Sequence, residues 1–293
     1  MKESGSKAAF KRIAWGLFSG IWGKSHSWFP VLTGPARGAW LHLDLRSQSS
    51  YFLGTYDRWI YERVPLHRML SPGQAAWDCG SFVGYYAAIF RKRVGPTGEV
   101  LVFEASRANY EALHPMPQRN GWNNVRIFHE AVGPENTSLT FVNNLGGASG
   151  PVGLGKDFST QGQAIETIEV RSLGIDEIRK TRASCSPQLL KLDLEAGEIH
   201  ALKNGAEVFG HIRPYVMLEL HGEEAGKAAN QWLKEYEYDG VVIEKLPKWA
   251  SLGSDAYLKA YRSLSGQLGG DVRSVGYLPH MLFCIPKEKE PHG

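Results

Sequence analysis

Short hydrophobic runs alternate with longer amphipathic segments from about residue 75 to the C-terminal end of the chain. Apolar runs of four to six residues bounded by turn residues are typical of buried strands, and the intervening segments suit crossover helices. The pattern predicts an α/β domain whose mostly parallel, twisted sheet has helices on both faces and an antiparallel strand near the C-terminus. The predicted strands are 75–79, 99–104, 125–128, 189–194, 215–220, 240–244 and 280–285.

The segments between these strands carry the helical pattern. Pro115 and Pro117 must bend or interrupt the second of the predicted helices, because proline lacks the amide hydrogen that a helix interior needs. Two further β segments, 139–142 and 167–170, flank a Gly- and Ser-rich stretch at 143–163 that is a candidate loop near a site. The predicted helices are 84–92, 107–120, 197–209 and 225–235.

The first fifty residues differ in pattern from the rest. Residues 10–29 are rich in aromatic side chains and helix-like, and 40–45 alternate as a strand does. The sequence after these residues shows no internal repeat and no domain linker. We therefore expect an N-terminal extension at 1–50, serving as a lid or an interaction segment, and one domain at 51–293.

Composition excludes several classes of protein. The 33 basic and 30 acidic residues are interspersed and give a net charge of +3, which does not indicate a nucleic-acid partner. Cys79, Cys185 and Cys284 are far apart and form no disulfide framework, so we expect a cytoplasmic protein. The apolar stretch at 13–22 is too short and too glycine-rich for stable membrane insertion. The pattern leaves a homodimer open.

The turn after the first predicted strand carries a cofactor signal. Its sequence, DCGSFVG at 78–84, has the form DxGxxxG instead of the GxGxxG of nicotinamide enzymes, which receives a pyrophosphate. An acidic residue there suits the positively charged amino-acid end of S-adenosylmethionine. Glu104, at the end of the second strand, can accept both ribose hydroxyls. The expected cofactor residues are Asp78, Gly80, Ser81, Gly84, Glu104 and Ala105, with Glu130 and Ala131 toward the adenine.

With these residues in view, the chain resembles the FkbM family of methyltransferases over about 52–286. The most specific segment is 191–198, KLDLEAGE, which is similar to the family's KxDxEGxE-type run after the fourth strand. The resemblance implies a Rossmann-like class I methyltransferase fold and S-adenosylmethionine as cofactor. It also implies methyl transfer to a hydroxyl of a sugar, polyketide or related metabolite. The other segments that carry it are 54–57, 78–86, 103–104, 130–133 and 172–176.

The chain departs from the family pattern at three places. Ser81-Phe82 replace the usual Ala-Asn, Ala105 replaces a proline, and Ala196-Gly197 invert the common Gly-Ala order. None of these changes removes a carboxylate expected to hold the cofactor.

A convergent polar set is expected where the fourth and fifth strands end. Asp193 and Glu195 are two residues apart, as are Glu219 and His221, so each pair projects to one side of its strand. One member could serve as general base, with His221 and Asp193 leading. The same ligands suit Mg²⁺, Mn²⁺ or Zn²⁺, which leaves a divalent metal open although we do not predict one. In the third interpretation these residues and Lys191 only form ion pairs.

The function predicted from the sequence is an S-adenosylmethionine-dependent methyltransferase acting on a hydroxyl of a small metabolite, saccharide or polyketide-like acceptor. One alternative is a non-catalytic module that keeps the methyltransferase fold, since a fold does not guarantee an activity. The other is a nicotinamide-dependent oxidoreductase, against which the missing GxGxxG argues.

Overall fold

The computed structural model of the chain describes most of the predicted domain. The predicted helix at 10–29 lies outside the described residues up to residue 25, as does most of the loop at 143–163. The described residues are 26–135, 137–143, 150–151, 166–195, 197–248, 256, 259–264 and 280–288.

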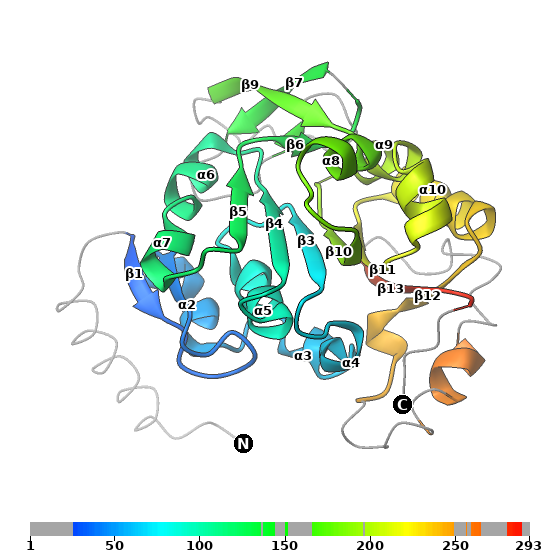
Figure 1. Cartoon of the computed structure of the whole chain (residues 1–293), viewed down its shortest axis with the longest axis horizontal. Helices are drawn as coiled ribbons and strands as arrows, with labels where there is room; N and C mark the ends of the chain where they lie inside the picture. The colour runs from blue at the N-terminus through cyan, green and yellow to red at the C-terminus, as the bar shows by residue number, and fades with distance from the viewer. Residues whose placement is uncertain are drawn as a thin grey trace, which may run out of the picture.

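A seven-stranded sheet forms the centre of the molecule (Figure 1). Its strands are β3 (Ala75–Cys79), β4 (Glu99–Phe103), β5 (Val125–Phe128), β10 (Pro187–Leu192), β11 (Tyr215–Leu220), β12 (Tyr238–Val242) and β13 (His280–Pro286). They lie in the order β12-β13-β11-β10-β3-β4-β5, and all run parallel except β13, which is antiparallel to both of its neighbours. The predicted Rossmann-like α/β fold is confirmed, including its antiparallel strand near the C-terminus.

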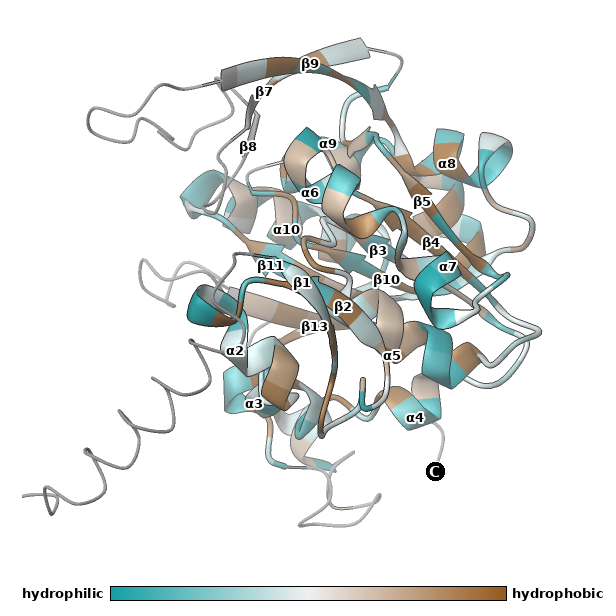
Figure 2. Cartoon of the chain, turned by 90° about the vertical axis from the view of Figure 1, so that its left-hand side faces the viewer, coloured by the Kyte–Doolittle hydropathy of each residue, from teal (hydrophilic) through white to brown (hydrophobic). Residues whose placement is uncertain are grey.

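Both faces of this sheet are buried, because successive side chains of a strand point to opposite sides. Ala76 and Met217 pack on one face with helix α5, and Trp77 and Leu218 pack on the other with α8, α9 and α10. In Figure 2 the central strands are largely hydrophobic, while the helices turn hydrophilic residues outward. The helices that cover the sheet are α5 (Tyr85–Val94), α6 (Arg107–Leu113), α7 (Met116–Asn120), α8 (Ile175–Thr181), α9 (Glu198–Lys203) and α10 (Glu223–Glu235).

Two of the predicted helices are shorter than expected. The helix predicted at 107–120 is divided into α6 and α7, as Pro115 and Pro117 require. The helix predicted at 197–209 ends at Lys203 and is followed by the π-helix η1 (Val208–Ile212). Asn204 and Gly205 separate the two, in keeping with the low helix propensity of both residue types.

The order of the strands determines where a ligand can bind. From β3 the chain continues to β4 on one side, whereas β10 lies on the other side of β3. The crevice at the carboxyl ends of β3 and β10 is therefore the topological switch point at which open α/β sheets hold their ligands.

A second, four-stranded sheet lies beyond this edge, above the ends of β4 and β5 in Figure 1. It contains β6 (Ala131–Val132), β7 (Thr137–Asn143), β8 (Gly150–Pro151) and β9 (Glu166–Leu173) in the order β6-β9-β7-β8. Because β7 and β9 pair antiparallel over seven residue pairs, the two β segments expected at 139–142 and 167–170 form one ladder.

The described part of the N-terminal region packs on the same core as the sheet. The strands β1 (Ser27–Pro30) and β2 (Trp40–Leu43) form an antiparallel hairpin, so the predicted helix at 10–29 was wrong for its last residues, which pair with β2. Phe29 and Leu41 join the apolar cluster beneath α5. The short helices α2 (Leu45–Leu53), α3 (Arg58–Tyr61) and α4 (Leu66–Met69) follow, and η2 (Ile243–Lys245) packs beside α3. Within the described residues no helix has the length and apolar character needed to cross a bilayer.

Candidate active site

A cavity of about 320 Å³ lies at the carboxyl ends of β3, β4 and β10. Eight of the residues singled out from the sequence line it, together with aromatic residues from α2, α5 and β7. The predicted residues in its wall are Gly80, Ser81, Glu104, Ala105, Glu130, Ala131, Asp193 and Glu195.

The turn after β3 forms the floor of the cavity. Gly80 has a φ of +79°, and a Cβ at this position would lie 1.8 Å from the carbonyl oxygen of Asp193, so only glycine fits. The amide of Gly80 donates to the carbonyl of Phe103 at 3.0 Å, which ties the turn to β4. Phe82 also has a positive φ, of +54°. The turn therefore presents its backbone to the cavity.

Asp78 and Gly84, the outer residues of the motif, do not line this cavity. Asp78 is fully buried and accepts a hydrogen bond of 2.6 Å from the hydroxyl of Ser81. Burial raises the pKa of Asp78, and the ammonium group of Lys191, 3.9 Å away, opposes that shift. Gly84 begins α5 at a φ of +80° and faces Leu113. Both residues hold the shape of the turn from beneath.

Glu104 lies at the end of β4 with its carboxylate fixed by the protein. One oxygen accepts the amide of Phe82 at 2.8 Å, and the other accepts the amide of Ser106 at 2.9 Å and the side-chain amide of Asn109 at 3.4 Å. Burial raises the pKa of Glu104 to about 7, although these hydrogen bonds oppose the shift. Oε1 already accepts two hydrogen bonds, whereas Oε2 accepts one and keeps capacity for a further hydrogen bond from a ligand in the cavity.

Small and apolar residues form the wall beyond Glu104. Ala105 and Ala131 lie on one side, and Leu139 and Phe141 of β7 reach over from the second sheet. The carboxylate of Glu130 is occupied by the guanidinium group of Arg182, whose Nε donates to it at 2.9 Å. A flat, apolar group would fit here, and Glu130 would reach it through its backbone.

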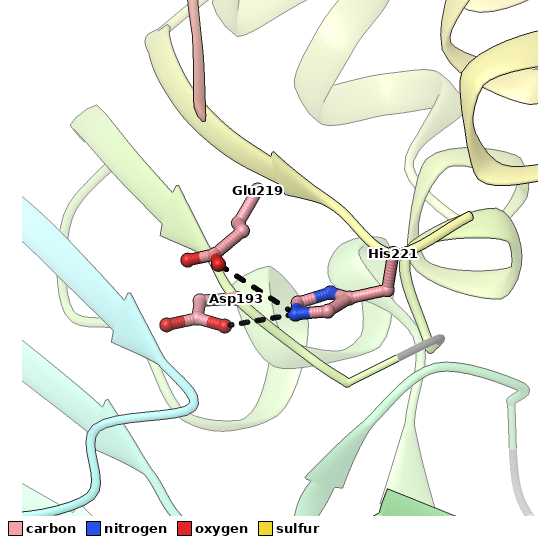
Figure 3. Close-up of side chains that lie close together, drawn as sticks. All are labelled: Asp193, Glu219 and His221. Atoms are coloured by element: carbon pink, nitrogen blue, oxygen red, sulfur yellow. Dashed lines mark ion pairs between the residues drawn. The ribbon is translucent and has the colours of Figure 1, made fainter. Parts of the chain in front are cut away.

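A polar cluster lies at the other end of the cavity, where β10 and β11 end side by side (Figure 3). His221 Nε2 is 4.0 Å from Asp193 Oδ1, 3.6 Å from Glu195 Oε2 and 3.7 Å from Glu219 Oε1. The four residues expected to converge are thus brought together. Asp193 and Glu195 face the cavity, while Glu219 and His221 lie behind them.

Two further residues hold this cluster in place. Lys191 donates to Asp193 Oδ2 at 2.9 Å and to the carbonyl of Gly80 at 3.3 Å, and its side chain is only 4% exposed. The fully buried Glu198 contacts His221 Nδ1 at 2.8 Å through Oε1, which also accepts the amide of Leu194 at 3.0 Å. Lys191 therefore pairs with Asp193 and Asp78, and Glu198 holds the imidazole ring of His221 in place.

The charges of the cluster shift its protonation. Burial lowers the pKa of His221, but the hydrogen bond to Glu198 and the charges of the surrounding carboxylates outweigh it and raise the pKa to about 9. Burial, reinforced by the charge of Asp193, raises the pKa of Glu219 to about 7. Burial also disfavours the charged form of Lys191, yet the carboxylates of Asp193 and Asp78 raise its pKa above the ordinary value.

Several wall residues were not expected from the sequence. Tyr51 and Tyr56, whose rings stack at 3.9 Å, come from the region before β3, and Phe141 comes from β7. Asn109 had a local signal, because it lies in the first turn of the helix that follows Glu104. The others are brought to the cavity by contacts distant in sequence, which no local pattern indicates.

The model of the methyltransferase FkbM domain matches residues 78–239, which is more than half of the chain. The chain belongs to the FkbM methyltransferase family. The match begins at Asp78 and includes Glu104 and the polar cluster through His221. The motif at 191–198 thus identified this FkbM methyltransferase correctly from its sequence.

Several solved methyltransferase structures are similar to this FkbM methyltransferase at low sequence identity. The methyltransferase FkbM of Methylobacillus flagellatus is 14% identical, with 80% of this chain and 52% of that chain covered and a TM-score of 0.45. This chain therefore spans about half the length of that protein. TYW2 of M. jannaschii, solved in complex with AdoMet, is 10% identical over 85% of this chain and 81% of that one, with a TM-score of 0.40. A search among curated proteins finds no match.

Proposed function

We propose that this FkbM methyltransferase transfers a methyl group from S-adenosylmethionine to a hydroxyl oxygen of a small metabolite, saccharide or polyketide-like acceptor. One observation carries the proposal. A single cavity joins the buried carboxylate of Glu104 at one end to the polar cluster of Asp193 and Glu195 at the other. The first is suited to a ribose and the second to a reacting hydroxyl.

The residues of the cavity fit the cofactor at three places. Gly80 and Ser81 line the cavity where the amino-acid part would lie. Glu104 would accept a ribose hydroxyl through Oε2. The wall of Ala105, Ala131 and Phe141 would enclose the adenine ring.

Methyl transfer requires little covalent help from the protein. S-adenosylmethionine, when bound, would supply a methyl group on a sulfonium, with the C–S electron pair left on sulfur when the acceptor oxygen takes the methyl group. The residues of the chain must align the acceptor oxygen and take the proton that its hydroxyl loses. Asp193 and Glu195 face the cavity, and His221 Nε2, which lies 4.0 Å from Asp193 Oδ1 and 3.7 Å from Glu219 Oε1, continues a pathway for that proton. Lys191 fixes the position of Asp193.

The aromatic wall beside this cluster would contact the acceptor. Tyr51, Tyr56 and Phe82 line the cavity near the glycine turn, and the rings of Tyr51 and Phe82 are 6.1 Å apart. Aromatic faces of this kind pack against flat rings and against the apolar faces of sugars. They support a small ring-containing acceptor.

Calorimetric titration with S-adenosylhomocysteine tests the proposal. We expect micromolar binding of this ligand and none of NADH. Glu104→Ala should weaken the binding by about 10–100-fold, since hydrogen bonds to a charged group contribute about 1.5–3 kcal/mol. Arg107→Ala, which removes an exposed ion pair on the outside of α6, is the matched control and should bind as the wild type does.

The alternatives give different titrations. A folded sample that binds neither ligand would contradict the proposal and favour a non-catalytic module. Binding of NADH alone would favour an oxidoreductase. Binding of S-adenosylhomocysteine would then justify a screen of hydroxyl acceptors, with release of S-adenosylhomocysteine from S-adenosylmethionine as the readout.

The affinity for S-adenosylhomocysteine should depend on pH through Glu104. The pKa of this buried carboxyl is about 7 in the free protein, and a ribose hydroxyl that donates to it favours its ionised form. Affinity should therefore be full above pH 7 and fall as the pH drops below it, by up to about tenfold per unit. Titrations at several pH values between 5.5 and 8 measure this, with Glu104→Gln as the control. A profile that is unchanged by this substitution would assign the dependence to another group.

A further inference from the structure

His221 presents one ring nitrogen to a gap between carboxylates. Its side chain is 7% exposed, and no donor or acceptor of the described residues lies within hydrogen-bonding distance of Nε2. The carboxylate oxygens around this atom are 3.6 to 4.0 Å away, beyond the range of a hydrogen bond. In Figure 3 the ring nitrogen, Asp193 and Glu219 point toward a common space.

These spacings match a set of ligands around one cation. One atom from each of Asp193, Glu219 and His221 lies within 4.8 Å of the other two. Two atoms each bound at about 2.1 Å to the same ion are separated by about 3.0–4.2 Å, depending on the coordination angle. The closer contacts of His221 fall within that range.

The contact with Glu198 prepares the imidazole for this role. Glu198 is fully buried and contacts Nδ1 at 2.8 Å, so the ring proton is held on that nitrogen when the ring is neutral. The lone pair then resides on Nε2, which faces the gap. A carboxylate that binds the second nitrogen of a histidine is the usual support of a metal ligand, because it fixes both the tautomer and the orientation of the ring.

The two carboxylate oxygens of Asp193 have different contacts, and this arrangement is compatible with metal binding. Oδ2 accepts the hydrogen bond of Lys191 at 2.9 Å, whereas Oδ1 is the oxygen nearest to His221. The lysine is therefore not placed between the three ligands. Asp193, Glu195 and Glu219 bring three carboxylates around the gap, and a cation there would offset their mutual repulsion.

We propose that Asp193, Glu219 and His221 bind one divalent cation at the acceptor end of the cavity, and that Mn²⁺ suits the site best. Two carboxylates favour hard cations such as Mg²⁺ and Mn²⁺, and the imidazole shifts the preference toward the transition metal. The role of the cation, though not its binding, rests on the proposed function. It would orient the acceptor hydroxyl and lower the pKa of its proton, and Glu195 lies beside it to accept that proton.

Electron paramagnetic resonance of Mn²⁺ tests the site directly, because the signal of the free aqueous ion falls when it binds. The full chain is first dialysed against a chelator and then titrated with Mn²⁺ alone. We expect one ion per chain, with Kd raised at least about tenfold in His221→Ala and in Glu219→Gln. His211→Ala, which changes an exposed histidine of η1, is the matched control and should bind as the wild type does.

Absence of a saturating site, or equal binding by the wild type and both variants, would overturn the inference. Should His221→Ala fail to fold, Glu219→Gln answers the same question with almost no change in side-chain volume. Titration of the same samples with S-adenosylhomocysteine separates the two proposals. A wild-type chain that binds S-adenosylhomocysteine but not Mn²⁺ overturns only the cation site, and a wild-type chain that binds Mn²⁺ but not S-adenosylhomocysteine overturns only the proposed function.

Discussion

Replacement of Lys191 by methionine is expected to lower the free energy of unfolding by about 3–5 kcal/mol, because it leaves the buried carboxylate of Asp78 and the partly exposed carboxylate of Asp193 without their cation. Lys191 Nζ lies 2.9 Å from Asp193 and 3.9 Å from Asp78, and Asp78 is fully buried between β4 and β10. Methionine fills much of the same volume, so the loss reports on charge and not on a cavity. Urea denaturation followed by circular dichroism measures the change.

A second substitution separates this explanation from a loss of packing. Lys191→Met combined with Asp78→Asn should recover part of the lost stability, since it removes one of the two uncompensated charges. Lys227→Met is the matched control, because Lys227 is a half-exposed lysine that also pairs with two carboxylates, Glu223 and Glu224. Its urea midpoint should not change measurably. A Lys191→Met protein as stable as this control would contradict the assigned role.

The central sheet was predictable because its signal is local. Strands β3 and β11 begin and end where the apolar runs do, since a strand buried on both faces is hydrophobic along most of its length. The order of the strands in the sheet was harder to predict from the sequence. It depends on which strands pair, and the antiparallel insertion of β13 between β11 and β12 joins residues far apart in sequence.

The polar cluster was predicted for a reason that the structure only partly supports. Strand alternation was expected to align Asp193 with Glu195, yet β10 ends at Leu192. Glu195 has a φ of +48°, a left-handed conformation that local sequence does not indicate for a glutamate. This turn, and not the pleat of a strand, brings its carboxylate to 3.6 Å from His221. The parallel pairing of β10 with β11 brings the ends of these two strands side by side.

The cofactor motif predicted the position of the turn in the sequence, but it predicted the role of each residue less well. A DxGxxxG pattern marks the turn, but spacing alone does not distinguish Gly80, which faces the cavity, from Asp78, which supports it from below. That difference depends on the neighbouring strand, because Lys191 is the residue paired with Asp78 in the sheet. The side chains of Tyr51 and Phe141 likewise reach the cavity only through tertiary packing.

Gly80→Ala is expected to destabilise the fold by about 2–5 kcal/mol and to weaken S-adenosylhomocysteine binding more than a hundredfold. An alanine in the left-handed region costs about 1–2 kcal/mol, and forcing a methyl group into packed surroundings costs about 1–3 kcal/mol more. The atom that it would meet, 1.8 Å away, is the backbone carbonyl of Asp193, which does not move unless β10 or the turn is displaced. Either movement separates the cofactor floor from the polar cluster.

Gly73→Ala isolates the conformational part of that cost. Gly73 has a φ of +87°, close to that of Gly80, but a Cβ there would meet only Thr97 Oγ1 at an ordinary 3.8 Å. It should therefore lose about 1–2 kcal/mol and bind S-adenosylhomocysteine as the wild type does. Urea denaturation and calorimetry on both variants make the comparison. Equal stability and equal affinity of the two would show that the turn tolerates a side chain at Gly80, and that the close approach to Asp193 is not what defines the site.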